Sequence, residues 1–388
     1  MFDDNNKFYS QEKYLDFKDV LVIPRFSQLN SRKEVNLETH LRFRNGMEWT
    51  GVPIIAANMT TTGTIEVYRV LSQYKIITAF HKFYTLCDYE AIMMDERGLN
   101  PDYFMVSTGI SESDLVNLDE IISSPKIPSK FICIDIANGY IERFYEVCIE
   151  LRNRFPDKIL VAGNVVTPDA VARLAEIGID IVKLGIGPGS ACTTRIQTGI
   201  GMPQLSCVLD VKYSFNNMNN MNNSNKFRPF IISDGGITCP GDCVKAFVAG
   251  SDFVMIGGEF SGHDENPGSL IEEQAGKFKL FYGMSSQYAM NHNYSDGRKN
   301  YRSSEGRVLK IKYKGALKDT VDNYLGGIRS ACTYTNSATI THLYENGRIY
   351  SASCKQQLND SCKVSQYRDE GFLKDKVKAD ARKNPRSR

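Results

Sequence analysis

The sequence predicts an α/β fold, a single-domain (β/α)8 TIM barrel. Eight short apolar runs recur at near-regular spacing, and each ends among Gly, Asn, Asp or Lys residues. Runs with so little polar alternation are typical of strands covered on both faces, as in parallel sheets. Between them lie helical patterns in which apolar residues recur at spacings of three and four. The runs span residues 52–58, 76–82, 103–109, 131–139, 158–164, 179–187, 229–236 and 251–258.

A doubly wound open sheet is the alternative architecture for the same pattern. It is less favoured because eight near-regular strand-helix units suit a closed barrel. The chain also lacks an early G-x-G-x-x-G after its first strand, which a dinucleotide-binding open sheet would carry. In a barrel, the catalytic residues are expected at the carboxyl ends of the strands.

We expect residues 1–345 to form the barrel domain, with an Asn-rich insertion at 214–226. Seven of the ten residues at 216–225 are Asn, a composition that favours disorder, and the insertion precedes a strand, opposite the catalytic face. The polar stretch 261–320 predicts a long flap or lid segment. The basic, polar residues 346–388 are expected to form a flexible C-terminal extension.

Composition excludes several functional classes. The chain has 388 residues with 47 basic and 45 acidic side chains, and this near balance argues against a dedicated nucleic-acid binder. No apolar run reaches the roughly 18 residues that a membrane span needs, and the polar N-terminus does not resemble a signal peptide. We therefore expect a cytoplasmic protein. Ten cysteines without zinc-type spacing, and five scattered histidines, predict no metal centre built from these side chains.

The loop GIGPGSACTTR (185–195) follows the sixth apolar run. Three glycines within five residues allow the backbone to approach a ligand closely, and successive amides in such a turn favour anions. Cys192 lies in this polar setting, where flanking amides and a following helix start favour a thiolate nucleophile. The spacing alone fits equally well a Gly-rich connector with an incidental cysteine.

Two further Gly-rich turns follow the last two predicted strands, at 234–236 and 257–258. Loops after strands seven and eight of this barrel frequently bind phosphate, although Gly is also common in any tight turn. A carboxylate does not bind phosphate, so Asp234 is better suited to a sugar hydroxyl. Lys82, Asp135, Asn138 and Asn164 also follow strands, and they converge on one rim only if the barrel closes.

Several motifs together resemble the GMP reductases, of the superfamily that also includes the IMP dehydrogenases. They are GIGPGSACTTR with TGIGMPQ, SDGG, MIGG, FYGMSS (281–286), YRSSEG (301–306) and LGGIRSACTY (325–334), and the resemblance covers roughly residues 15–340. The dehydrogenases usually carry a CBS regulatory domain after the second strand, whereas here HKFYTLCDYEAI continues without one. They also activate water with an Arg-Tyr pair, whereas this chain has Tyr301 and Arg302 followed by Glu305.

The resemblance implies reductive deamination, in which GMP and NADPH give IMP, ammonia and NADP. Cys192 would attack C2 of the purine, and Thr194 with Glu305 would supply the proton for the departing amine. The matching substrate positions are Ser190, Asp234, Gly235, Gly236, Gly257, Gly258, Tyr282, Gly283, Met284, Ser285, Arg302, Ser303, Ser304 and Gly306. The matching NADPH positions are Ser31, Arg32, Lys82, Asp135, Ile136, Ala137, Ile186, Gly187, Ser330 and Thr333. A potassium ion would be held by carbonyl oxygens of Gly187, Gly189 and Cys192, next to Arg195.

The resemblance also implies a homotetramer that acts on small molecules and binds neither nucleic acid nor membrane. Two departures from the family pattern stand out: Thr60 occupies a position where an Asp is expected, and the flap carries NHNYSDGRKN at 291–300. Two alternatives remain. One is an IMP dehydrogenase without its regulatory domain, and the other is a non-catalytic purine-nucleotide sensor that has kept the pocket.

Overall fold

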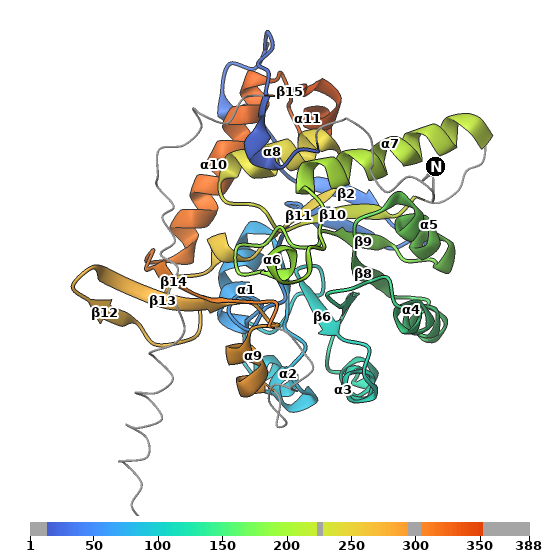
Figure 1. Cartoon of the computed structure of the whole chain (residues 1–388), viewed down its shortest axis with the longest axis vertical. Helices are drawn as coiled ribbons and strands as arrows, with labels where there is room; N and C mark the ends of the chain where they lie inside the picture. The colour runs from blue at the N-terminus through green and yellow to red at the C-terminus, as the bar shows by residue number, and fades with distance from the viewer. Residues whose placement is uncertain (1–13, 223–227, 294–303, 352–388) are drawn as a thin grey trace, which may run out of the picture.

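A closed barrel of eight parallel strands forms the centre of the molecule (Figure 1). The computed structural model describes residues 14–222, 228–293 and 304–351. Each predicted apolar run supplies one strand, so the barrel prediction is confirmed and the open sheet is wrong. The strands are β4 (Ile54–Ala56), β5 (Ile77–Ala79), β6 (Phe104–Thr108), β7 (Phe131–Asp135), β8 (Ile159–Val165), β9 (Ile181–Leu184), β10 (Phe230–Asp234) and β11 (Phe253–Ile256).

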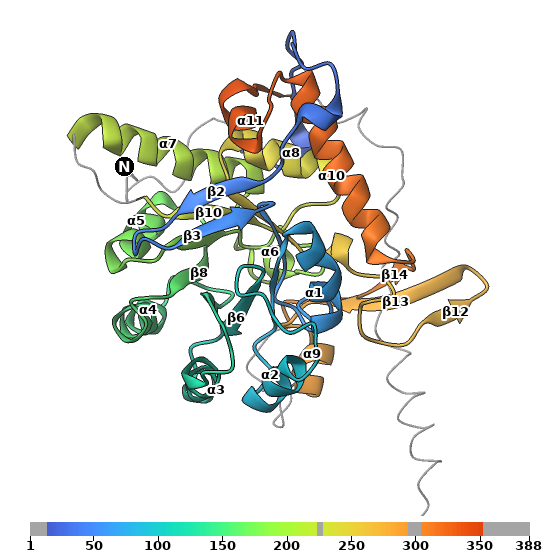
Figure 2. The ribbon, with the colours of Figure 1, turned by 180° about the vertical axis from the view of Figure 1, so that it is seen from behind.

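Closure comes from the pairing of the last strand with the first, which aligns Met255 of β11 with Ile55 of β4. Helices follow the strands and cover the barrel from outside (Figures 1 and 2). They are α1 (Ile65–Leu71), α2 (Leu86–Met93), α3 (Glu112–Ser123), α4 (Glu142–Arg154), α5 (Pro168–Ile177), α7 (Gln204–Asn222), α8 (Pro240–Ala249) and α10 (Leu317–Tyr334). Shorter helices are α6 (Thr194–Thr198), α9 (Gln287–Asn293) and α11 (Ile340–Asn346), with 3-10 turns η1 (Phe17–Asp19), η2 (Arg32–Glu34), η3 (Ser72–Tyr74) and η4 (Gly258–Phe260).

A β-hairpin fills the end of the barrel where the strands begin. Its strands are β2 (Thr39–Arg42) and β3 (Glu48–Gly51), seen across the barrel in Figure 2. Trp49 is buried against Phe253, and Phe43 packs edge-on against Phe131 and Phe230. This end is therefore packed with aromatic side chains, which leaves the opposite end, at the carboxyl ends of the strands, to hold ligands.

The segment after β11 is more regular than its polar composition predicts. Strands β12 (Ile271–Glu273), β13 (Gly276–Tyr282) and β14 (Val308–Lys312) form a three-stranded antiparallel sheet beside the barrel. Burial rather than polarity alternates along β13, where Lys279 and Phe281 are buried and their neighbours are partly exposed. The centre of the expected flap, at 294–303, lies outside the described residues.

The structure corrects two expectations about order. Residues 214–222 of the Asn-rich insertion belong to α7, so the helix that begins at Gln204 extends through them; the rest of the insertion, from 223, lies outside the described residues. The expected C-terminal extension also begins with regular structure, because β15 (Ile349–Ser351) pairs antiparallel with β1 (Val20–Val22). Backbone pairing with a distant segment, which composition does not reveal, accounts for the second difference.

Candidate active site

A cavity of about 960 Å³ opens at the carboxyl ends of the barrel strands. Residues at or just after the carboxyl ends of all eight strands line it, as expected if the barrel closes and the strand ends meet. Among the polar residues expected at this rim, Lys82, Asp135 and Asn164 line the cavity. Asn138 does not, because its side chain turns back to accept a hydrogen bond from the amide of Tyr140 at 3.1 Å.

The loop 185–195 forms one wall of this cavity. At Gly187, φ is +86°, and a Cβ there would lie 2.5 Å from Cγ of Arg195, so both conformation and space require Gly. The amide of Cys192 donates to the carbonyl of Gly189 at 3.0 Å, which closes a tight turn. The turn presents the partly buried Cys192 side chain to the cavity.

Cys192, Thr194 and Glu305 form a chain of hydrogen bonds in the cavity. The Cys192 thiol donates to Oγ1 of Thr194 at 3.2 Å, and this hydroxyl donates to Oε2 of Glu305 at 2.8 Å. Each of the two hydrogen bonds is donated in the direction of the Glu305 carboxylate. The three residues can therefore carry a proton between the sulfur and Glu305. These are the three residues that the sequence resemblance implied as catalytic.

Backbone pairing holds Glu305 against the cysteine loop. The amide of Thr193 donates to the carbonyl of Glu305 at 2.8 Å, and the amide of Arg307 donates to the carbonyl of Ala191 at 2.9 Å. Cys192 and Gly306 thereby form an antiparallel bridge. Two segments more than a hundred residues apart in sequence are joined into one structural unit.

A second wall contains the glycines expected to bind phosphate. Ser190, Gly235, Gly236, Gly257 and Gly258 all line the cavity. A Cβ at Gly258 would lie 2.9 Å from Oγ of Ser190, so a side chain there would displace this hydroxyl. The arrangement offers backbone amides and a hydroxyl on one side of the cavity, which suits an anion.

Tyr282 does not line the cavity, in contrast to Gly283, Met284 and Ser285 beside it. Its hydroxyl lies 3.3 Å from Oγ1 of Thr60, and burial raises its pKa. Thr60 also lies near Met284, with 3.4 Å between its amide and Sδ. Thr60, which departs from the family pattern, therefore helps to position the segment 282–284.

The last part of the expected substrate site is described only in part. Ser304 donates to the carbonyl of Gly306 at 3.0 Å, and neither residue lines the cavity. A Cβ at Gly306 would lie 2.7 Å from the amide of Ser286, so these residues shape the loop next to Glu305. Arg302 and Ser303 lie outside the described residues.

The floor of the cavity contains a buried lysine that the sequence reasoning missed. The side chain of Lys183 is 2% exposed and forms ion pairs with Asp135 and, at 3.2 Å, with Asp234. Burial lowers the pKa of this ammonium, but the two carboxylates outweigh burial and hold its pKa above the ordinary value. A charged residue inside the apolar run IDIVKLGIG was the signal that could have revealed it.

Asn164 completes this floor. Its Nδ2 donates to Oδ2 of Asp234 and to the carbonyl of Gly185, each at 2.8 Å. Its Oδ1 is buried and has no hydrogen-bond partner among the described residues. Asp234 is thus held from two sides, by an ammonium and by an amide.

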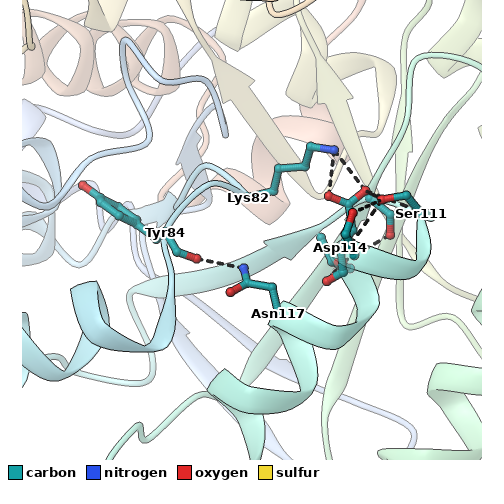
Figure 3. A network of polar contacts seen from close by, with 8 residues as sticks. Lys82, Tyr84, Ser111, Asp114 and Asn117 are labelled. Atoms are coloured by element: carbon teal, nitrogen blue, oxygen red, sulfur yellow. Dashed lines mark hydrogen bonds and ion pairs between the residues drawn. The ribbon is translucent and has the colours of Figure 1, made fainter. Parts of the chain in front are cut away.

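Lys82 is held by a carboxylate at the start of α3 (Figure 3). Its Nζ lies 2.9 and 3.0 Å from the two carboxylate oxygens of Asp114, which also accepts from the hydroxyl of Ser111 at 2.6 Å. The same helix reaches the segment after Lys82 through Asn117, which donates to the carbonyl of Tyr84 at 2.9 Å. Asp114 was missed from sequence because its partner lies on another strand-helix unit.

The remaining cofactor positions divide into two groups. Ile136, Ala137, Ile186 and Gly187 line the cavity with Asp135 and Lys82. Ser31, Arg32, Ser330 and Thr333 do not line it. They lie at η2 and on α10, which pack against each other. Both views show the blue segment that follows β1 beside α10 (Figures 1 and 2). Ser31 caps η2, while the hydroxyl of Thr333 donates to the carbonyl of Ser330 at 2.7 Å.

The expected potassium position stays a prediction, and Arg195 lies beside it, since a Cβ on Gly187 would be 2.5 Å from Cγ of Arg195. Gly187, Gly189 and Cys192 lie together on the cavity wall. The side chain of Arg195 does not line the cavity, because it donates to the carbonyl of Met202 and lies 3.4 Å from Asp16. Within the described ranges, no group of three His, Cys, Asp or Glu residues is placed to hold a metal ion. None of the described helices is long and apolar enough to cross a membrane.

Comparison with known proteins identifies the family. The IMP dehydrogenase / GMP reductase domain matches residues 14–361. The chain belongs to this family. Relatives include human GMP reductase 2, 46% identical over 334 residues, which are 85% of this chain and 91% of the relative. Human GMP reductase 1 is also 46% identical over 334 residues, with 85% and 92% covered. The GMP reductase of Edwardsiella ictaluri is 45% identical over 331 residues, again with 85% and 92% covered.

Family membership extends over both the barrel and the sheet β12–β14, since the matched range includes both. It therefore covers the cavity and the segment that carries Glu305. The sequence resemblance, which rested on motifs within roughly residues 15–340, is confirmed by this match.

Proposed function

We propose that this chain catalyses the NADPH-dependent reductive deamination of GMP to IMP with release of ammonia. The observation that carries the proposal is the hydrogen-bonded chain of Cys192, Thr194 and Glu305 inside the barrel cavity. Relatives named GMP reductase, 45–46% identical over most of the chain, support the same reaction.

The first step forms a bond between Sγ of Cys192 and C2 of the purine. The thiol proton has a path through Thr194 to Glu305, because the thiol donates to the Thr194 hydroxyl and this hydroxyl donates to the carboxylate. Attack at C2 makes that carbon tetrahedral, and covalent catalysis divides a difficult substitution into two easier steps.

The second step breaks the bond from C2 to the exocyclic nitrogen. An amine leaves only after it gains a proton, and Glu305 returns the proton it received through the hydroxyl of Thr194. A positioned general acid of this kind contributes about 10²- to 10⁴-fold to the rate. Ammonia departs and the purine stays attached to Cys192.

Bound NADPH supplies the hydride that converts C2 of the attached purine to the C–H of IMP. The protein groups that would hold the cofactor near this carbon are those lining the cavity beside the cysteine loop, Lys82 and Asp135 to Ala137 among them. They fit it chemically, since an ammonium, a carboxylate and backbone groups offer donors and acceptors to a carboxamide and a ribose. Release of IMP restores the Cys192 sulfur.

The nucleotide would bind with its phosphate against Ser190, Gly236, Gly257 and Gly258, and with its ribose on Asp234. The purine would lie near Met284 and Ser285, above Cys192. The lining supports this assignment, since Ser190 and the three glycines line the same cavity as Cys192, Met284 and Ser285.

A second copy of the chain completes the cofactor site in our proposal. Ser31, Arg32, Ser330 and Thr333 form a cluster away from the cavity of their own chain. Arg32 is exposed, and a guanidinium matches a 2′-phosphate bidentately. The cluster would therefore bind the adenosine end of a neighbour's NADPH within a homotetramer in the cytoplasm, where thiols such as Cys192 stay reduced.

The proposal includes a potassium ion on the cysteine loop. Its donors would be the carbonyls of Gly187, Gly189 and Cys192, and neutral carbonyl oxygens suit a monovalent ion. The Gly189 carbonyl accepts one hydrogen bond, from the amide of Cys192, and a carbonyl has a second lone pair for a cation. Turnover that is equal in potassium and in tetramethylammonium salts would remove the ion from the proposal.

The deciding experiment follows NADPH oxidation with GMP, IMP and XMP, together with ammonia release. We expect activity with GMP only, and we expect Cys192→Ala to abolish turnover while GMP still binds in calorimetry. Formation of XMP from IMP and NAD would instead identify an IMP dehydrogenase. GMP binding by the wild-type chain without any NADPH oxidation would identify a nucleotide sensor.

A further inference from the structure

The side chain of Lys183 extends from the interior of β9 to the floor of the cavity. Three acceptors surround its ammonium: a carboxylate oxygen of Asp135, Oδ2 of Asp234 at 3.2 Å, and the amide oxygen of Asn58 at 3.5 Å. An ammonium has three protons to donate, so this group is fully coordinated without water. Asp135 ends β7 and Asp234 ends β10, on either side of the strand pair β8 and β9.

The fold makes space for this side chain at some cost. A Cβ on Gly163 of β8 would lie 2.6 Å from Cβ of Lys183, so the neighbouring strand must carry Gly beside the lysine. A buried charge is costly, and well-packed apolar residues in place of a buried ion pair are often at least as stable. Stability alone therefore does not account for an ammonium at this position.

The two carboxylates are each left with one oxygen for a ligand. The ion pair from Lys183 and the hydrogen bond from Asn164 both fall on Oδ2 of Asp234, and the contact from Lys183 to Asp135 falls on Oδ1. Both residues line the cavity. In the proposed function Asp234 accepts from the ribose of GMP and Asp135 lies with the cofactor, so one ammonium holds the two binding carboxylates together.

We propose that Lys183 is a positioning residue that fixes the nucleotide-binding carboxylate of Asp234 relative to the cofactor-binding carboxylate of Asp135. This inference rests on the proposed function, because it uses the ligands assigned to the two carboxylates there. Lys183 touches neither reacting atom. It sets the distance between the two binding groups, and through them the distance between C2 of the purine and the hydride donor.

The test is a set of crossed variants, with calorimetric dissociation constants for GMP and NADPH and steady-state kinetics for both. Asp234→Asn is expected to weaken GMP binding, and Asp135→Asn is expected to weaken NADPH binding. Lys183→Met is expected to weaken both, with a loss of about 100-fold in kcat/KM, because it leaves two partly buried carboxylates without the ammonium that pairs with them. Lys183→Arg keeps the charge and should recover a large part of the activity.

The crossed backgrounds separate positioning from a general structural effect. In an Asp234→Asn background, Lys183→Met should weaken GMP binding little further but still weaken NADPH binding. In an Asp135→Asn background the pattern should reverse. A merely structural lysine would lower both affinities equally in every background. The double variants also carry one unpaired carboxylate instead of two, which keeps the test open if Lys183→Met alone does not fold.

Lys310→Met is the matched control, since Lys310 is also buried and pairs with Glu273 on the sheet outside the cavity. It should leave both affinities near the wild-type values. Equal effects of Lys183→Met and Lys310→Met, or identical losses in all backgrounds, would overturn the role of Lys183. Unchanged GMP affinity in Asp234→Asn would overturn the ribose assignment and this inference with it, whereas NADPH oxidation without GMP dependence would count against the proposed function alone.

Discussion

Oγ1 of Thr194 lies 2.8 Å from Oε2 of Glu305, which joins two residues 111 positions apart in the chain. Thr194 begins α6 after the cysteine loop, and Glu305 precedes the last strand of the antiparallel sheet. The loop after β9 carries the proposed nucleophile, and the segment before β14 carries the proposed acid. Neither segment alone contains a complete proton path to the sulfur.

Replacement of Glu305 by Gln should lower kcat by about 10²- to 10⁴-fold, because the amide cannot return a proton to the leaving amine. The KM for GMP should change little, since the proton is needed only after the substrate has bound. Stopped-flow absorbance should show the purine step slowed, with binding unaffected. Thr193→Val is the matched control, because the Thr193 hydroxyl faces the carbonyl of Ser304 and not the proton path. Equal losses in both variants would show that the loop, and not the acid, had been disturbed.

The barrel was predictable because each of its strands can be recognised from its own short stretch of sequence. Runs such as the one from 131 to 139 are apolar on both faces and end in polar residues, so number, order and closure follow from the sequence. The tail was not predictable in the same way. Ile349–Ser351 is ordered by backbone pairing with Val20–Val22, and this depends on a segment more than 300 residues away.

The site shows the same division between local and tertiary information. Gly187 and Gly258 belong to Gly-rich turns that the sequence shows directly. Cys192 and Glu305 were predicted from the family motifs that contain them. Lys183 was missed because the segment around it was interpreted only as an apolar strand, although the lysine is the one charged side chain in its second half. The Asp114 partner of Lys82 was missed because its pairing depends on how α3 packs beside the next unit.

Replacement of Gly258 by Ala should weaken the binding of GMP. The new Cβ would lie 2.9 Å from Oγ of Ser190, so this hydroxyl must turn away from its position beside the proposed phosphate. A hydrogen bond to a charged group is worth about 1.5–3 kcal/mol, which corresponds to roughly 10- to 100-fold in affinity. Calorimetry with GMP and with guanosine checks this, because only GMP should lose affinity. Gly326→Ala on α10, where nothing lies within 4 Å of the new Cβ, is the control. A matching loss with guanosine would place the phosphate elsewhere.

Replacement of Arg152 by Met should strongly destabilise the fold. Arg152 on α4 lies 2.5 Å from Asp180, whose side chain is 2% exposed, and burial raises the pKa of that carboxyl. Loss of one partner of a buried pair costs about 3–5 kcal/mol. The free energy of unfolding in urea measures this loss of stability. Arg143→Met on the same helix removes an exposed pair with Glu146 and should change stability by less than about 1 kcal/mol. Similar values for both variants would contradict the prediction.

The stability of the fold should fall as the pH is lowered from about 6.5 toward 4, in part through His81. Burial lowers the pKa of His81 from 6.5 to about 4, and its Nδ1 is buried without a hydrogen-bond partner among the described residues. Because the folded-state pKa lies below the unfolded one, the unfolded chain takes up the proton first as the pH falls. The contribution of neutral His81 to the free energy of unfolding is fully present above about pH 6.5. It is lost as the pH falls from about 6.5 to about 4, and the total loss is at most about 3 kcal/mol.

His81→Phe isolates this effect, since Phe keeps a ring to stack on Tyr84, 4.1 Å away between centroids, but cannot titrate. The variant should lose less stability than the wild type between pH 7 and pH 4.5 in urea unfolding. Burial also lowers the pKa of His263, so part of the pH dependence remains in both proteins and cancels in their difference. Parallel curves for the two proteins would contradict the prediction, because they would show that burial does not lower the pKa of His81 in the folded state.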